Sequence, residues 1–227
     1  IVNTCKKYNM PAVASTDTGN MFGALEFSVY AKDNGIQPIV GSELLLDATE
    51  FIKGKNFISQ SNIEKEESFC KIILLAMNKE GFLNLVALVS DSFLKRDGAL
   101  TPHIKLNQLK EKSNGIIALC GGYEGTFGKM ILNNQTSRIE EAVNYFKKTF
   151  PDNRFYIELE RHGFEDEIKT ENDLIDIGLK YDIPFVATNN CHFMTKDMFE
   201  AQDVLSCIGE SHYISETDRK RLTPEHY

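Results

Sequence analysis

The amino-acid sequence predicts an α/β protein in which buried strands alternate with helices. Six short runs of apolar, β-branched and large residues have the character of strands that are buried on both faces. These runs lie at 12–16, 37–46, 70–76, 116–120, 154–160 and 183–188. Segments with helical periodicity lie at 21–33, 79–95, 137–149, 165–181 and 196–209. Such alternation is typical of a parallel sheet.

The number of strand–helix units favours a distorted (β/α)7 barrel, with an open doubly wound sheet as the alternative. Residues 1–8 have the pattern of a helix already under way, so we expect the chain to be a fragment that lacks its first strand. A barrel without one strand exposes two sheet edges, so we expect either that the intact domain has further residues or that the isolated chain associates. Segment 47–68 is expected to be a surface excursion, and 96–115 a longer connection with a short helix near 105–112.

Composition and charge exclude several classes of protein. The net charge of −8 over 227 residues argues against a surface that coats nucleic acid, because such a surface needs clustered lysine and arginine. Five scattered cysteines without a Cys-x-x-Cys pair argue against a zinc ribbon or a disulfide scaffold, and they favour reduced thiols in the cytoplasm. No apolar run approaches the roughly 18 residues of a membrane span. No strand is followed by a glycine-rich nucleotide-binding motif.

The stretch 14–27 has the pattern of a strand, a polar turn and a helix. Gly19 is expected to form the turn, and Asn20 to cap the helix that follows. The apolar residues expected on one face of this helix are Met21, Phe22, Leu25 and Val29. Turns at the carboxyl ends of strands carry the functional sites of parallel α/β folds.

Polar residues and glycines gather at the expected carboxyl ends of several strands. They are Asp17, Thr18, Glu43, Gly121, Gly122, Glu160, His162, Asn190 and His192. Converging carboxylates and imidazoles are what a metal-dependent hydrolase needs. Each also has a simpler explanation: a turn cap for Asp17, a bond to a backbone carbonyl for His192 and an ordinary loop position for His162. Glu43 interrupts an apolar strand and requires a partner, so it indicates a polar cleft.

Five segments resemble, in the same order, one known family. Their sequences are TDTGNMFGALEF at 16–27, GIQPIVGSE at 35–43, LLAMNKEGFLNL at 74–85, GIIALCGG at 115–122 and VATNNCHF at 186–193. They resemble the PHP (polymerase and histidinol phosphatase) domain of bacterial replicative DNA polymerase III alpha subunits. The resemblance covers nearly the whole chain, and it implies a distorted (β/α)7 barrel formed by a single, N-terminally truncated PHP domain over 1–227.

The resemblance also implies a setting for the domain. The parent chain would be a cytoplasmic DNA-directed DNA polymerase (a nucleotidyltransferase) that uses Mg²⁺, and its catalytic palm lies outside these 227 residues. The expected partners are the polymerase core of the same chain, the proofreading exonuclease subunit and other DNA polymerase III holoenzyme subunits. DNA would be reached through the parent chain, and no membrane is involved.

Metal-ligand positions carry over from the family one at a time. The first-strand His-x-His motif has no counterpart here, whereas Glu43 and His192 keep the family's residue types. The other positions have changed, to Thr18 and Lys71 in place of histidines, Gly122 in place of a cysteine and Asn190 in place of an aspartate. We therefore expect no catalytic residue, metal or cofactor in this fragment. The residues expected to line the cleft are Asp17, Thr18, Glu43, His162, Asn190 and His192.

The replacements alter the chemistry of the cleft. Thr18 offers only a weak neutral oxygen, and the positive charge of Lys71 would repel a metal ion. Lys71 is instead expected to form a salt bridge with Glu43 that fills the former site. Cys120 and Cys191 are near the cleft and leave open the ligation of a soft metal.

Two functions of different classes follow. The first is a catalytically inactive structural module that supports the polymerase core and docks the proofreading exonuclease. The alternative is a metal-dependent phosphoesterase, either a 3′–5′ exonuclease or a pyrophosphatase, that uses Glu43 and His192 with Zn²⁺ or Mn²⁺. The loss of histidine at 18, cysteine at 122 and aspartate at 190 favours the structural module.

Overall fold

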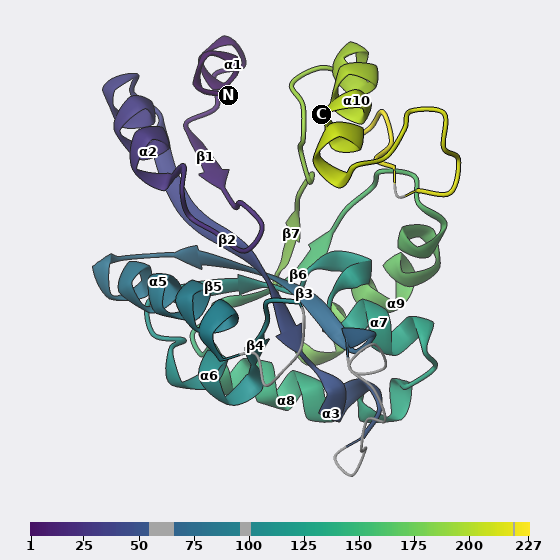
Figure 1. The fold of residues 1–227 in the computed structure, drawn as a ribbon. Coiled ribbons are helices and arrows are strands. Elements are labelled where there is room, and N and C mark those ends of the chain that lie inside the picture. Colours follow the sequence, from purple (N-terminus) through teal and green to yellow (C-terminus); the bar gives the residue numbers. More distant parts are fainter. Residues whose placement is uncertain (55–65, 96–100, 220) are drawn as a thin grey trace.

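One curled sheet forms the centre of the computed structural model, which describes residues 1–54, 66–95, 101–219 and 221–227 (Figure 1). Its strands are β1 (Ala12–Ser15), β2 (Gln37–Asp47), β3 (Phe69–Ala76), β4 (Ile104–Lys105), β5 (Ile116–Leu119), β6 (Phe155–Leu159) and β7 (Phe185–Ala187). The order across the sheet is β1-β2-β3-β5-β6-β7, and β4 pairs with β2 beside this path. The predicted α/β class and all six predicted strands are confirmed.

Helices pack around this sheet. They are α1 (Val2–Lys7), α2 (Ala24–Asp33), α3 (Thr49–Ile52), α5 (Lys79–Leu94), α6 (Leu106–Glu111), α7 (Thr126–Leu132), α8 (Ile139–Thr149), α9 (Glu165–Tyr181) and α10 (Phe199–Glu210). The five helices predicted from periodicity are all present, and α6 is the expected short helix. Within the described part of the chain, no helix has the length and apolar character needed to cross a bilayer.

Strand β3 departs from the predicted parallel arrangement, because it runs antiparallel to both of its neighbours, β2 and β5. The register pairs Asp47 at the end of β2 with Phe69 at the start of β3. Antiparallel neighbours can be joined without a helical crossover, which a parallel pair requires. The prediction of a purely parallel sheet was therefore wrong at this strand, whereas β1–β2, β5–β6 and β6–β7 are parallel as expected.

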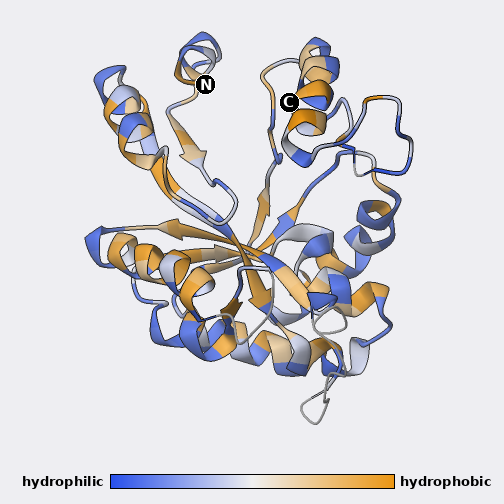
Figure 2. Cartoon of the chain, viewed as in Figure 1, coloured by the Kyte–Doolittle hydropathy of each residue, from blue (hydrophilic) through white to orange (hydrophobic). Residues whose placement is uncertain are grey.

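The main core lies between the sheet and helices α5, α7 and α8. Apolar residues are concentrated along the strands and on the helix faces that meet them (Figure 2). The rings of Phe146 on α8 and Phe155 on β6 stack with centroids 4.7 Å apart. Phe51 of α3 also belongs to this core and is only 1% exposed. The start of the predicted surface excursion over 47–68 is therefore buried, and its part at 55–65 lies outside the described residues.

The sheet is open between its outer strands, β1 and β7, each of which pairs with a single neighbour among the described residues. Helices α2 and α10 lie on the two arms beside this opening (Figure 1). The apolar residues expected on one face of the predicted helix are largely exposed: on α2, Leu25 is 78% and Val29 53% exposed, and Phe22, which precedes α2, is 92% exposed. Apolar periodicity identified the helix correctly, but it did not identify which face is covered.

This exposed apolar surface leads to a prediction for the isolated chain. At tens of micromolar, sedimentation equilibrium of the 227-residue chain should detect species heavier than the 25.7 kDa monomer, because sheet edges and exposed apolar residues pair between molecules. The variant with Phe22→Ser and Leu25→Glu should shift the equilibrium toward monomer. A wild-type chain that remains monomeric across this concentration range would contradict the prediction.

Candidate functional site

The polar turn after β1 is bound to strand β2 along its length. Gly19 has φ +67°, a left-handed conformation that glycine adopts without strain. Its N–H donates to the Glu43 carbonyl at 2.8 Å, and the Glu43 N–H donates to the Asp17 carbonyl at 3.2 Å. These bonds place Thr18 beside Glu43, where a strand-like bridge joins the two residues. The predicted turn at Gly19 is confirmed.

Asn20 does not have the capping role that was predicted for it. Its side-chain oxygen accepts the N–H of Phe22 at 3.1 Å, and its amide donates to the Thr18 carbonyl at 3.0 Å. Helix α2 begins only at Ala24, after Gly23 in the cap position. Asn20 therefore shapes the turn itself, because a short amide side chain bonds readily to nearby backbone.

A buried lysine is the centre of the candidate site. Lys71 Nζ lies 3.1 Å from Glu43 Oε2 and 4.0 Å from Glu160 Oε1, and the Lys71 side chain is only 6% exposed. The Thr18 hydroxyl donates to the other oxygen of Glu43 at 3.3 Å. Glu43 is paired with Ile73 across β2 and β3, so Lys71 lies diagonally opposite Glu43 on the same face of the sheet. The predicted Lys71–Glu43 salt bridge is confirmed.

The charges of this cluster perturb one another. Burial is the largest influence on Lys71 and favours its neutral form, but the carboxylates of Glu43 and Glu160 outweigh it and raise the pKa of Lys71. Burial raises the pKa of Glu160 to about 7, although Lys71 acts in the opposite direction. Lys71 therefore stays charged at neutral pH, whereas Glu160 is close to its titration midpoint.

Glu160 fills space that a side chain at position 122 would need. A Cβ placed on Gly122 would lie 2.5 Å from Glu160 Oε2, and Gly122 has φ +55°. Both facts disfavour any larger residue there. Glu160 was expected at a strand end but not among the residues that line the cleft, because its proximity to Gly122 depends on how the end of β6 meets the segment after β5.

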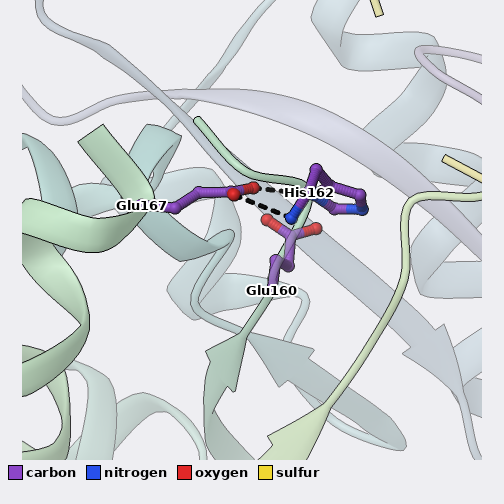
Figure 3. Close-up of side chains that lie close together, drawn as sticks. All are labelled: Glu160, His162 and Glu167. Carbon is purple, nitrogen blue, oxygen red and sulfur yellow. Dashed lines mark hydrogen bonds and ion pairs between the residues drawn. The ribbon is translucent and has the colours of Figure 1, made fainter. Parts of the chain in front are cut away.

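Glu160, His162 and Glu167 form a second buried group whose ligand atoms lie within 4.8 Å of one another (Figure 3). His162 Nδ1 lies 2.7 Å from Glu167 Oε1, and Glu167 Oε2 accepts the N–H groups of His162 and Phe164 at 2.8 and 3.1 Å. The remaining ring nitrogen of His162 accepts the Asn190 N–H at 3.2 Å. These bonds involve both ring nitrogens of His162 and both oxygens of Glu167, so the group is a poor metal site. Its role is to hold the residues before α9 against the first turn of that helix.

A cleft of about 390 Å³ lies over the Lys71 cluster. Its lining residues are Thr18, Glu43, Lys71, Glu124, Asn190, His192, Phe199, Gln202, Asp203, Ser206, Glu210, Arg221 and Leu222. Four of the six residues expected to line a cleft are therefore brought together: Thr18, Glu43, Asn190 and His192. Asp17 and His162 are not in this lining, and His162 is buried behind it with 3% exposure. Sequence reasoning missed the residues from α10.

Comparison with known proteins identifies the family. The model of the PHP domain family matches residues 1–162. The chain belongs to the PHP domain family. It is 34% identical over 96% of its length to the DNA polymerase III subunit alpha of Caulobacter vibrioides, and 36% identical over its whole length to that of Rickettsia bellii. It spans only 18% of the length of each of these relatives.

Two further comparisons give lower sequence identities. The chain is 31% identical over its whole length to the DNA polymerase III subunit alpha of Vibrio cholerae. A solved structure of a candidate metal-dependent phosphoesterase from Bifidobacterium adolescentis aligns with a TM-score of 0.39 and 10% identity, covering 83% of this chain and 79% of that one.

The residues of this PHP domain do not suit the metal cluster that the family resemblance implies. Both oxygens of Glu43 already have partners, in Lys71 and Thr18. The Lys71 ammonium places a positive charge beside the carboxylate that a metal would need, and like charges at this range repel. No step of chemistry is therefore assigned to a metal at this site.

The two cysteines near the cleft do not supply a ready soft-metal ligand. Burial raises the pKa of Cys120 to about 12, and its sulfur accepts the Glu158 N–H at 3.2 Å. Burial also raises the pKa of Cys191. Since the thiolate is the form that binds metal, burial disfavours the metal-binding form of both residues.

Removing the lysine should destabilise the domain strongly. Lys71→Met would leave the Glu43 carboxylate, whose side chain is 19% exposed, without its ionic partner, and losing one partner of a buried ion pair costs about 3–5 kcal/mol. Urea unfolding of the chain below 1 µM, followed by circular dichroism, measures this change. Adding Glu43→Gln to Lys71→Met should recover part of the loss.

The matched control for this variant is Lys169→Met on α9. Lys169 is 52% exposed and pairs with Glu165 and Asp166 at the surface. Its replacement should change the unfolding free energy by less than about 1 kcal/mol. Equal effects of the two lysine replacements would contradict a central role for Lys71.

Glu160→Gln should remove a specific pH dependence. The pKa of Glu160 rises from 4.5 to about 7 on folding, so between these values the folded domain holds a proton that the unfolded chain has released. The free energy of unfolding should therefore fall by on the order of 3 kcal/mol as the pH rises through this window. Above pH 7 it should level off. Urea unfolding at pH 5 and pH 8 should show this loss in wild type and a smaller one in the variant. Glu165→Gln, 83% exposed on α9, should behave like wild type.

Proposed function

We propose that this PHP domain is a catalytically inactive structural module of a DNA polymerase III alpha subunit. In this role residues 1–227 form one domain that supports the polymerase core of the same chain and docks the proofreading exonuclease subunit in the cytoplasm. The parent chain performs DNA-directed DNA synthesis with Mg²⁺, and this domain contributes no catalytic residue to it. The alpha-subunit relatives support the setting.

One observation carries the inactive part of the proposal, namely the Lys71 ammonium held between Glu43 and Glu160. A cation fixed by the protein neutralises the carboxylates without lowering the pKa of a water molecule or leaving an open coordination position, and a metal-dependent hydrolase needs both. Gly122 and Glu160 support the same conclusion, because the space for a ligand side chain at 122 is taken.

The competing function is a metal-dependent phosphoesterase. Its support is the position of Glu43 and His192, the two retained ligand types, in the lining of one cleft. The two functions differ in what they require of Lys71. An active metal site needs this lysine displaced from Glu43, whereas the structural module needs it in place.

Metal content and hydrolysis separate the two functions. A full-length alpha subunit that contains this chain should retain only substoichiometric Zn²⁺ or Mn²⁺ after dialysis, as measured by plasma mass spectrometry. It should not hydrolyse p-nitrophenyl phosphate or single-stranded DNA, because Lys71 lies beside Glu43 where a water-activating metal would be needed. The companion measurement is co-purification with the proofreading exonuclease subunit, which should be retained by Glu43→Gln and His192→Asn.

Hydrolysis that needs added Mn²⁺ and disappears in both Glu43→Gln and His192→Asn would overturn the structural assignment in favour of the phosphoesterase. If exonuclease binding is lost only in variants whose whole domain unfolds, the result would support a role of the domain in stabilising the polymerase core. An alpha subunit that binds the exonuclease equally well without residues 1–227 would contradict the docking role.

A further inference from the structure

Helix α10 turns its polar side toward the interior. The residues of this helix that line the cleft are Phe199, Gln202, Asp203, Ser206 and Glu210. Their spacing of three or four residues places them on one face of the helix. Apart from Phe199, the cleft side of α10 is therefore polar, and only Asp203 and Cys207 of this helix are buried.

An ionic cluster around the buried carboxylate of Asp203 fixes this orientation, with the Arg219 side chain 3% exposed and that of Arg221 49% exposed. Arg219 donates two hydrogen bonds to the Asp203 carboxylate, at 2.6 and 2.7 Å, and Arg221 donates a further bond at 2.8 Å. Hydrogen bonds from Arg219 hold the pKa of Asp203 at about 2, so the carboxylate is charged at neutral pH. Rotation of α10 about its axis would break these bonds and leave charges buried without partners, which is strongly unfavourable.

The opposite side of α10 is apolar and exposed. Val204, Leu205 and Ile208 are 43%, 60% and 72% exposed and are neighbours on one helical face. Tyr213 and Ile214, just after the helix, are 77% and 61% exposed. We call these five residues the α10 outer face, and the apolar segments of α10 are visible in Figure 2.

The α10 outer face differs from ordinary surface variation. Single exposed apolar residues, such as Leu179 on α9, are common on soluble proteins. A group of adjacent exposed apolar residues instead marks an interaction surface. Here the sequence fixes the polar side inward with three charged residues, so the apolar side has no means of turning into the core of this domain.

We infer that the α10 outer face packs against the polymerase body of the same polypeptide, meaning the part of the alpha subunit outside these 227 residues. This inference rests on the proposed function. The chain spans 17–19% of the relatives' length, so more than four-fifths of each relative lies outside the aligned segment. A partner in the same polypeptide is always present, and permanent interfaces are the more apolar class. A subunit that dissociates would leave the five apolar residues in water.

Photo-cross-linking in the full-length alpha subunit tests the inference. Benzoylphenylalanine replaces Ile208 in one variant and Leu179 in a matched control, and mass spectrometry maps the products. The Ile208 variant should cross-link to residues of its own chain beyond the 227, in the isolated monomeric subunit, and at least about fivefold more than the Leu179 control, since only a packed probe stays in contact. Products restricted to the exonuclease subunit, to a second alpha chain, to residues 1–227 or to the expected first strand of the same domain would each overturn it.

A second variant pair tests the energetic role of the surface. In the full-length subunit, Leu205→Glu with Ile208→Glu should shorten the thermal half-life of primer extension by about fivefold or more, because it buries charge in the interface. Leu179→Glu should keep the half-life within about twofold of wild type. Unchanged far-UV circular dichroism at 25 °C confirms that the charged variant is folded. Equal half-lives of the charged variant and wild type would overturn the inference that the α10 outer face is a docking surface. Metal content and hydrolysis test the proposed function separately.

Discussion

The buried ammonium of Lys71 is the interaction on which the cleft depends. A charge with 6% exposure is unfavourable unless it is paired, and here Glu43 supplies the direct partner while Glu160 lies 4.0 Å away. These residues come from β3, β2 and the end of β6, and Thr18 adds the turn after β1 through its bond to Glu43. One protein-borne cation thus connects separate strand ends, which is the structural part of what a metal ion does, without the chemistry that a metal provides.

Local patterns predicted most of the secondary structure because they depend on neighbours in the sequence. The bounds of α9 were predicted to the residue, and β3 and α5 to within one residue. The direction of β3 was not predictable in this way, since it depends on how the chain returns after β2. Which side of α10 is exposed was not predictable from local patterns either, because it depends on Asp203 meeting Arg219 and Arg221 sixteen and eighteen positions later.

The site, too, was predicted only as far as local sequence patterns reach. Residue types at strand ends identified Thr18, Glu43, Asn190 and His192 as neighbours, and the family's ligand positions, together with charge, suggested that Lys71 would pair with Glu43. The role of Glu160 needed the spatial relation between its carboxylate and Gly122, whose missing side chain leaves the room that Glu160 occupies. His162 looked like a loop residue or a cleft residue, but its bonds to Glu167 make it part of the buried start of α9.

The central claim is that Lys71 is charged and held by Glu43 in the folded domain, and NMR of its Nζ measures this directly. In a chain labelled with ¹⁵N at the lysine side chains, assigned with Lys71→Met, the Lys71 signal should remain that of an ammonium at pH values where exposed lysines have titrated. Glu43→Gln should lower its midpoint. A Lys71 signal that titrates below the exposed lysines, or a midpoint unchanged by Glu43→Gln, would contradict the account.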